Sequence, residues 1–315
     1  MNNQESEAQH LPVMAEQVVE RLVTNTRGAY LDLTAGSGGH LKALAQKLES
    51  AACLHGVDID PAAIDRARKF LAGIDQNLKL VQSDFARPAD LSGQWSEEKF
   101  DGILLDLGMS SPQVDDPERG ISFKYDGPLD MRFDPEGRVT AEELVNSLSQ
   151  KELTRIIFKY GEERRAARIA TAIVKERQRG HISSTFRLKE TVLTAVSPSH
   201  RKKALARVFQ AFRIAVNNEL EKIKSVLPTA VSLLKPGGRL AVISYHSLED
   251  RIVKQFFKSL SGNVCTCPPE LPICVCGKVA TLKLLTRRVV VPAEDEIESN
   301  PRSRSARLRV VEKLP

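Results

Sequence analysis

The chain has 315 residues and a formal net charge of +6, which is long enough for one large domain or two modest ones. Its 42% hydrophobic and 27% charged residues describe an ordinary soluble globular protein. The sequence contains no apolar run long enough for a membrane span and no apolar targeting segment near its polar N-terminus. We therefore expect a cytoplasmic protein.

Lysine and arginine gather in three segments, at residues 164–179, 201–207 and 302–309. Phosphate backbones bind such clusters largely through electrostatics. Each cluster taken alone is more often a solvated helix face. The three together favour a nucleic-acid partner.

Residues 30–40 (YLDLTAGSGGH) join a buried strand pattern directly to a glycine-rich turn. Apolar spacing predicts a strand over 29–33 and a helix over 41–48. Glycines in the turn allow positive φ and let a ligand lie against bare backbone at a helix N-terminus. The pattern indicates a site for a nucleoside-type molecule, and a tight turn without a ligand is the alternative.

A second predicted strand, over 53–60, ends in two acids. Asp58 follows Gly39 by 19 residues (58 − 39), the distance at which an acid accepts hydrogen bonds from both hydroxyls of a bound ribose. Asp60 stands before Pro61, which suits the first position of a helix. We therefore assign Asp58 to the ligand and Asp60 to the helix cap.

Two further strands are predicted, over 78–81 and over 100–107. The second is an almost continuous apolar run, which is typical of a strand covered on both faces, and it contains Asp106 near its end. The carboxyl ends of parallel strands meet at one edge of a sheet. The glycine turn, Asp58 and Asp106 are therefore expected to form one ligand crevice.

After residue 113 the alternation of strands and helices stops. The predicted helices there are 141–148, 151–160, 162–179, 185–196 and 204–234, the last with a break at Pro228. The sheet resumes with a strand within 234–246, a helix begun by Ser247, and final strands at 282–285, 289–291 and 306–311. We predict an α/β fold with a doubly wound sheet in two parts, 1–113 and 222–315, interrupted by a mostly helical insertion, 114–221.

Four cysteines lie close together, at Cys265, Cys267, Cys274 and Cys276. Four thiolates from two such pairs can form a tetrahedral zinc site. The single residue inside each pair departs from the usual spacing of two to four, so a structural zinc and free thiols in a surface loop both stay open. Cys53 is expected in the core.

The cofactor is decided by the residues around the turn. A nicotinamide dinucleotide needs a small residue at the sixth position of its glycine motif, and Leu41 occupies that position here. S-adenosylmethionine instead presents a ribose diol and a cationic methionine end. Asp58 would bind the diol, and Asp32 or Asp106 would compensate the positive charge.

Eight stretches in order resemble the bacterial 16S ribosomal RNA cytosine-N4 methyltransferases. They are 32–40 (DLTAGSGGH), 101–108 (DGILLDLG), 110–113 (SSPQ), 126–132 (DGPLDMR), 160–164 (YGEER), 209–214 (FQAFRI), 243–251 (ISYHSLEDR) and 300–305 (NPRSRS). The resemblance implies a class I methyltransferase domain with an inserted helical domain that recognises RNA. It also implies transfer of a methyl group from S-adenosylmethionine to N4 of a decoding-centre cytidine, with the small ribosomal subunit as partner.

The resemblance also implies site residues. The implied cofactor contacts are Gly38, Gly39, His40, Asp58, Phe85, Asp106 and Gln113. Asp106 is in addition the candidate catalytic residue, as a hydrogen-bond acceptor for the cytosine amine.

Candidate substrate contacts are Asp130, Arg132, His246, Asp250 and Arg251. Structural roles compete with this assignment: a turn that orders the insertion at residues 126–132, a cap at His246, and a charge pair at Asp250 and Arg251.

One departure from the family is local, since residues 203–207 read KALAR where the family has HPATR. It affects the expected substrate contacts more than the reaction. Two other functions stay open: a methyltransferase for protein or small molecules, which would not need the basic insertion, and a ribosome-assembly factor that binds RNA without turnover.

Overall fold

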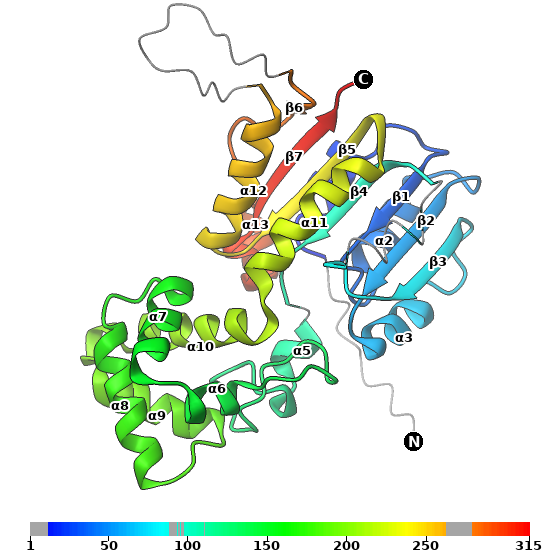
Figure 1. The fold of residues 1–315 in the computed structure, drawn as a ribbon. Helices are drawn as coiled ribbons and strands as arrows, with labels where there is room; N and C mark the ends of the chain where they lie inside the picture. Colours follow the sequence, from blue (N-terminus) through cyan, green and yellow to red (C-terminus); the bar gives the residue numbers. More distant parts are fainter. Residues whose placement is uncertain (1–11, 88–92, 94, 96–97, 110, 263–278) are drawn as a thin grey trace, which may run out of the picture. The chain divides into compact units, whose positions relative to one another are not determined.

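The computed structural model describes residues 12–87, 93, 95, 98–109, 111–262 and 279–315. The chain divides into two compact units, residues 1–108 with 222–315 and residues 109–221 (Figure 1). The sequence placed these boundaries at 113 and 221. The four cysteines of the predicted zinc site lie outside the described residues.

The first unit is built on a seven-stranded sheet with the order β3-β2-β1-β4-β5-β7-β6. Its strands are β1 (Ala29–Asp32), β2 (Cys53–Asp58), β3 (Asn77–Gln82), β4 (Phe100–Asp106), β5 (Leu234–Ser244), β6 (Leu282–Leu284) and β7 (Arg307–Lys313). Strands β1 to β5 are parallel, and β7 runs antiparallel between β5 and β6. All five parallel strands therefore direct their carboxyl ends to the same edge.

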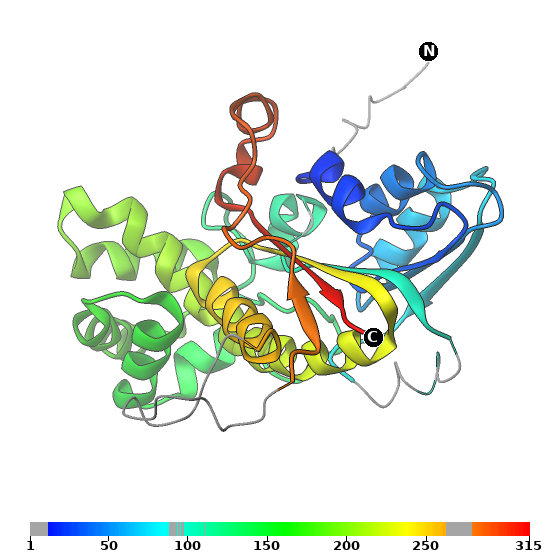
Figure 2. The ribbon, with the colours of Figure 1, turned by 90° about the horizontal axis from the view of Figure 1, so that it is seen from above.

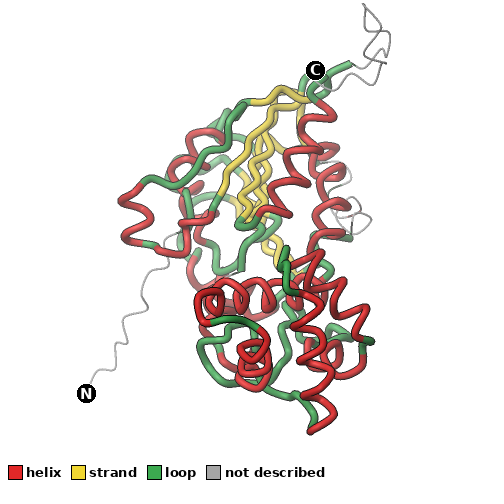
Figure 3. The backbone as a smooth tube through the Cα atoms, turned by 90° about the vertical axis from the view of Figure 1, so that its left-hand side faces the viewer, coloured by secondary structure: helices red, strands yellow, loops and turns green. Residues whose placement is uncertain are grey.

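Helices cover both faces of this sheet. On one face lie α1 (Ala15–Leu22), α2 (Gly39–Ala45) and α3 (Pro61–Phe70), and on the other lie α11 (Glu219–Leu233) and α12 (Ser247–Leu260) (Figure 2). Figure 3 shows the strands enclosed between these helices. The predicted doubly wound α/β class is confirmed, and the layers explain why Ile103, Leu104 and Leu105 of β4 are all fully buried.

Two short helical elements precede the last strand, α13 (Glu294–Ser299) and η3 (Pro301–Ser305). The strand predicted over 289–291 is absent as an element, because only an isolated bridge joins Val290 to Leu308 there. The chain thus enters β7 through a compact turn that faces the end of β5.

The second unit is helical, and its described residues contain no strand (Figure 3). Its helices are α5 (Ser111–Asp115), η1 (Pro117–Arg119), α6 (Ala141–Ser147), α7 (Gln150–Gly161), α8 (Ala166–Arg179), α9 (Thr185–Ala195), η2 (Pro198–His200) and α10 (Arg201–Asn217). Ile157, Ile169, Val192 and Phe212 belong to its own buried cluster. This unit therefore has a hydrophobic core separate from the one beneath the sheet.

The helix break predicted at Pro228 is wrong. Helix α10 ends at Asn217, because Asn218 adopts the left-handed conformation (φ 52°) and its N–H donates to the Ile214 carbonyl. Asparagine tolerates this conformation better than most residues. Helix α11 then continues through Pro228. The helix predicted from 162 begins only at Ala166, because Glu162 is also left-handed (φ 50°).

No helix in the described part of the chain is both long and apolar enough to cross a membrane.

Candidate cofactor site and substrate-binding residues

The glycine turn after β1 has a backbone that other residues would strain. Gly36 and Gly38 have positive φ (53° and 90°), and a Cβ at Gly38 would lie 3.0 Å from Leu71 Cδ1. Gly38 is also the N-cap of α2. The Gly36 and Gly38 N–H groups donate to Asp58 Oδ2 and to the Ala35 carbonyl, at 2.8 Å each. With no side chains at these glycines, the turn still lets a polar ligand approach the backbone at a helix N-terminus.

Asp58 connects the end of β2 to this turn. Its Oδ2 accepts the Gly36 N–H at 2.8 Å, and its Oδ1 accepts the Asp60 N–H at 2.9 Å. Each carboxylate oxygen can accept a further hydrogen bond, so both remain usable by a ribose diol. The predicted cap is confirmed, since Asp60 Oδ1 accepts the Ala62 N–H at 3.0 Å. Burial raises the pKa of Asp58.

Asp32, at the end of β1, is a buried carboxyl group with 1% exposure. Its Oδ1 accepts both the N–H and the hydroxyl of Thr34, at 2.9 and 3.1 Å. The pKa of Asp32 is raised to about 7, mainly by burial and in part by the charges of Asp106 and Asp58, while the hydrogen bonds from Thr34 oppose the shift. Three carboxyl groups from three adjacent strand ends therefore repel one another, and a cationic ligand would relieve that repulsion.

Asp106, at the end of β4, combines a structural tie with an unused acceptor. Its N–H donates to Thr34 Oγ at 2.7 Å, while its Oδ1 is buried without a hydrogen-bond partner among the described residues. Burial raises the pKa of Asp106 to about 6, although a hydrogen bond from the Tyr245 phenol lowers it. A buried acceptor without a partner is unfavourable unless a ligand supplies the donor.

Tyr245 is a residue of this site that the sequence did not single out. It follows β5 and binds Asp106, and burial together with the Asp106 charge raises its pKa well above the ordinary value. Gly108 permits this approach, because a Cβ there would lie 2.5 Å from Tyr245 Cε2. The available signal was its position inside the matched stretch 243–251.

The other predicted cofactor contacts have varied surroundings. His40 is 6% exposed, and its Nε2 lies 3.0 Å from the Val13 carbonyl oxygen, which ties α2 to the start of α1. Phe85 is half-buried after β3, beside the ion pair of Asp84 with Lys222 (2.8 Å). Gln113 lies in α5, within the helical unit.

Among the predicted substrate contacts of the first unit, His246 is the N-cap of α12, and its Nδ1 accepts the Glu249 N–H at 3.4 Å. Asp250 binds Arg309 through two hydrogen bonds, at 2.7 and 3.1 Å. Burial raises the pKa of Asp250, but the hydrogen bonds and charges of Arg309 and Arg307 lower it below its ordinary value. Arg251 follows on the same helix. His246 thus caps a helix, which was the structural alternative to substrate contact. The arginines that bind the Asp250 carboxylate, Arg307 and Arg309, are on β7.

In the helical unit, Asp130 and Arg132 bind each other. Arg132 donates from Nε and from Nη2 to the two oxygens of Asp130, both at 2.7 Å, and from Nη1 to the Gly137 carbonyl at 2.7 Å. Asp126 accepts the Phe186 N–H at 3.1 Å. These bonds fit the alternative that residues 126–132 are an ordered turn.

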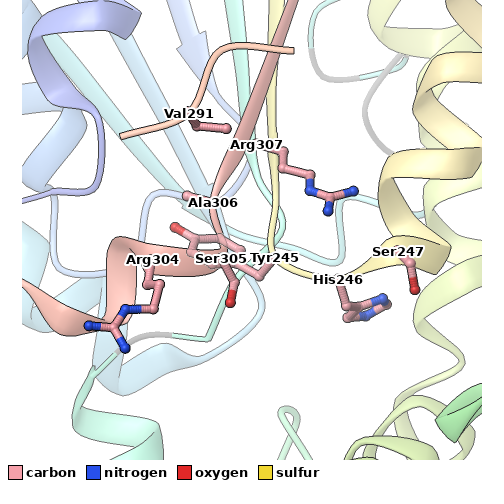
Figure 4. Close-up of a pocket in the computed structure, with 8 residues that line it drawn as sticks. All are labelled: Tyr245, His246, Ser247, Val291, Arg304, Ser305, Ala306 and Arg307. Atoms are coloured by element: carbon pink, nitrogen blue, oxygen red, sulfur yellow. The ribbon is translucent and has the colours of Figure 1, made fainter. Parts of the chain in front are cut away.

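A cavity of about 430 Å³ opens beside Tyr245. Its lining residues are Tyr245, His246, Ser247, Val291, Arg304, Ser305, Ala306 and Arg307 (Figure 4). Apart from Val291, which lies between β6 and α13, they come from the ends of β5 and η3 and the starts of α12 and β7. Sequence reasoning did not find this cavity, because its two main segments are more than fifty residues apart in the chain.

Comparison with known proteins gives consistent matches over the whole length of the chain. Relatives named ribosomal RNA small subunit methyltransferase H include those of Heliobacterium mobile, 44% identical over 98% of this chain and 100% of the relative, and Carboxydothermus hydrogenoformans, 45% identical over 98% and 99%. The relative from Caldicellulosiruptor saccharolyticus is 46% identical over 97% and 99%. The MraW methylase family matches residues 7–314. The chain therefore belongs to the MraW methylase family.

Proposed function

We propose that this chain transfers a methyl group from S-adenosylmethionine to the exocyclic N4 of a cytidine in 16S ribosomal RNA, at the decoding centre of the small subunit. The observation that carries the proposal is the full-length match to a methylase family whose curated relatives are named as small-subunit ribosomal RNA methyltransferases. The site supports it independently, because three carboxyl groups surround a glycine turn suited to a nucleoside.

The residues present fit S-adenosylmethionine. The backbone from Gly36 to Gly39 would hold its polar groups, and Asp58 would bind the ribose diol with the oxygen lone pairs left by Gly36 and Asp60. Asp32 would compensate the cationic sulfonium and ammonium groups. His40 and Phe85 complete the proposed contacts in the first unit, and Gln113 stays a prediction from the resemblance to the family.

The bound cofactor supplies an electrophilic methyl group on a positively charged sulfur. The cytosine amine is a poor nucleophile, because its lone pair is delocalised into the ring, so the protein must hold it in line with the methyl group. The unpartnered Asp106 Oδ1 is the proposed acceptor for the amine N–H. Methylation of the amine releases one proton from its nitrogen, and Asp106 above its raised pKa of about 6 would accept it.

The proposed substrate is RNA within the small ribosomal subunit, which also accounts for a cytoplasmic location. Arg164, Arg165 and Arg168 give the helical unit a basic segment that suits RNA. Of the predicted substrate contacts, Asp130 and Arg132 are proposed to stabilise an ordered turn in this unit through their mutual hydrogen bonds. His246, Asp250 and Arg251 would act from the first unit.

The test is incubation of the chain with labelled S-adenosylmethionine and undermethylated small ribosomal subunits, followed by nucleoside analysis. We expect N4-methylcytidine, and its absence would contradict the proposal. Asp58→Asn should abolish product by removing cofactor binding. The matched control is Asp65→Asn, the same change at a carboxylate on α3 whose side chain is 68% exposed, and it should keep full activity.

We further propose that Cys265, Cys267, Cys274 and Cys276 bind a structural zinc ion, since thiolates are favoured zinc ligands. Zinc content of the purified chain should be one ion per chain and should fall in Cys265→Ser. Cys53→Ser, which removes the fifth cysteine, should retain the metal. A metal-free wild-type chain would refute the proposal.

A further inference from the structure

The cavity beside Tyr245 has a lining that donates hydrogen bonds and carries positive charge. Its charged lining side chains are Arg304 and Arg307, and its hydroxyl groups are those of Tyr245, Ser247 and Ser305. No carboxylate lines it among the described residues. Its volume of about 430 Å³ lies within the range of ligand sites, about 300–1,000 Å³. Such a lining favours an anion.

His246 adds a buried donor that the protein itself leaves unused. Its Nδ1 accepts the Glu249 N–H, so in the neutral ring the proton resides on Nε2. Nε2 lies 3.2 Å from Glu249 Oε1, yet it is buried and forms no hydrogen bond there, and the side chain is only 10% exposed. The Glu249 carboxylate is close to this N–H but makes no hydrogen bond with it, so a ligand with an aligned acceptor would satisfy the donor.

Arg304 and Arg307 both retain hydrogen-bond donors for a ligand, but they differ in their contacts with carboxylates. Asp250 takes its short bonds from Arg309, at 2.7 and 3.1 Å, and only a 3.4 Å bond from Arg307. Arg307 therefore keeps most of its five donors while Asp250 orients it. Arg304 is exposed and makes no ion pair within the described part of the chain.

We propose that this cavity binds phosphate groups of the substrate RNA strand, next to the nucleotide that is methylated. In Figure 4 the side chains of His246, Ser247 and Arg307 extend to one side of the lining, and the Arg304 guanidinium extends to the other. Cations on both sides suit a polyanionic strand better than a single small anion. Tyr245 lines the cavity and binds Asp106, so a strand held here lies beside Asp106, the proposed acceptor for the cytosine amine N–H.

The identification of the anion as RNA phosphate rests on the proposed function. In this assignment Asp250 does not contact RNA itself. Asp250 is a positioning residue for Arg307 and Arg309. His246 is both a helix cap and a phosphate donor.

The experiment measures binding of a short single-stranded, cytidine-containing RNA to the full chain at several salt concentrations, with S-adenosylmethionine binding measured in parallel. Arg304→Gln and Arg307→Gln should each weaken RNA binding about tenfold, the effect of one charge-assisted hydrogen bond. The slope of log K against log salt should become shallower by about 0.7 for each. Cofactor affinity should not change, which shows that the variants are folded.

His246→Asn separates the two tasks of that residue. Asparagine is a preferred N-cap, so α12 keeps its cap while the Nε2 donor is lost. RNA binding should weaken with an unchanged salt slope, because a neutral donor is removed.

The matched control for the two arginine variants is Arg27→Gln. It makes the same change of charge at a side chain that is 68% exposed and precedes β1, at the opposite edge of the sheet.

Wild-type RNA affinity and salt slope in both Arg304→Gln and Arg307→Gln would overturn the inference. Binding of inorganic phosphate that these variants lose, with unchanged RNA binding, would assign the cavity to a small anion and overturn it as well. If the variants lose RNA binding but the wild-type chain methylates no cytidine, the proposed reaction fails while the phosphate site stands.

Discussion

Asp32→Asn is the most direct perturbation of the carboxyl cluster. Asp32 is 1% exposed, and burial is the largest cause of a pKa raised from 3.8 to about 7. Asparagine has nearly the same shape, and its oxygen can still accept the N–H and hydroxyl of Thr34. The substitution therefore removes the charge and keeps the local hydrogen bonds.

The magnitude follows from the difference between the folded and unfolded pKa values. A shift of about 3 units corresponds to about 4 kcal/mol. Because the folded pKa is raised, the stability linked to the protonated form is complete below about pH 4. It is lost as the pH rises through about 7. When the pH rises from about 5 to about 8, ionisation of Asp32 should therefore lower the free energy of unfolding by about 2–3 kcal/mol.

The assay is denaturant unfolding of the cofactor-free wild type and variant at these two pH values. On going from the lower to the higher pH, the free energy of unfolding should fall by about 2–3 kcal/mol more in the wild type than in Asp32→Asn. S-adenosylmethionine should bind the wild type more tightly as the pH rises through 7, because the carboxylate form compensates its charge, and should bind the variant about tenfold more weakly. Equal pH dependence of stability in the two proteins would refute the assignment of a buried, shifted carboxyl group.

Three further substitutions test other parts of the structure. Gly38→Ala should lower the unfolding free energy by about 1–3 kcal/mol, because φ is 90° and Cβ would lie 3.0 Å from Leu71 Cδ1; unchanged denaturant unfolding would contradict this. Tyr245→Phe removes the hydrogen bond that lowers the pKa of Asp106, so the acidic limb of the kcat/KM profile should move to higher pH; an unmoved limb would exclude Asp106 as the titrating group. Asn217→Ala breaks three hydrogen bonds to backbone groups at an 8% exposed side chain and should destabilise the helical unit by about 2–3 kcal/mol. Hydrogen exchange across residues 141–217 would detect the loss, and full protection would count against it.

Local sequence patterns sufficed for most of the elements. The apolar run over 100–107 and the Asp60-Pro61 start of α3 each depend on neighbours in the chain, and both were predicted correctly. The error at Pro228 has a physical cause. A proline within a helix lowers its stability, but the actual end at Asn218 depends on that residue adopting a left-handed conformation, while the Asn217 side chain binds the backbone at Met131 and Phe133.

Hydrophobic periodicity and glycine placement are local properties, so they sufficed to predict the class of fold and the residue types at the strand ends. How those strand ends act together depends on contacts between distant parts of the chain. Burial raised the pKa values of Asp32 and Asp106, and packing brought Tyr245 against Asp106. The cavity with Arg304 and Arg307 likewise depends on the pairing of β7 with β5, which are distant in the sequence. The electrostatic effects of such contacts depend on how deeply each group is buried and on the distances between groups. A local sequence pattern contains neither quantity.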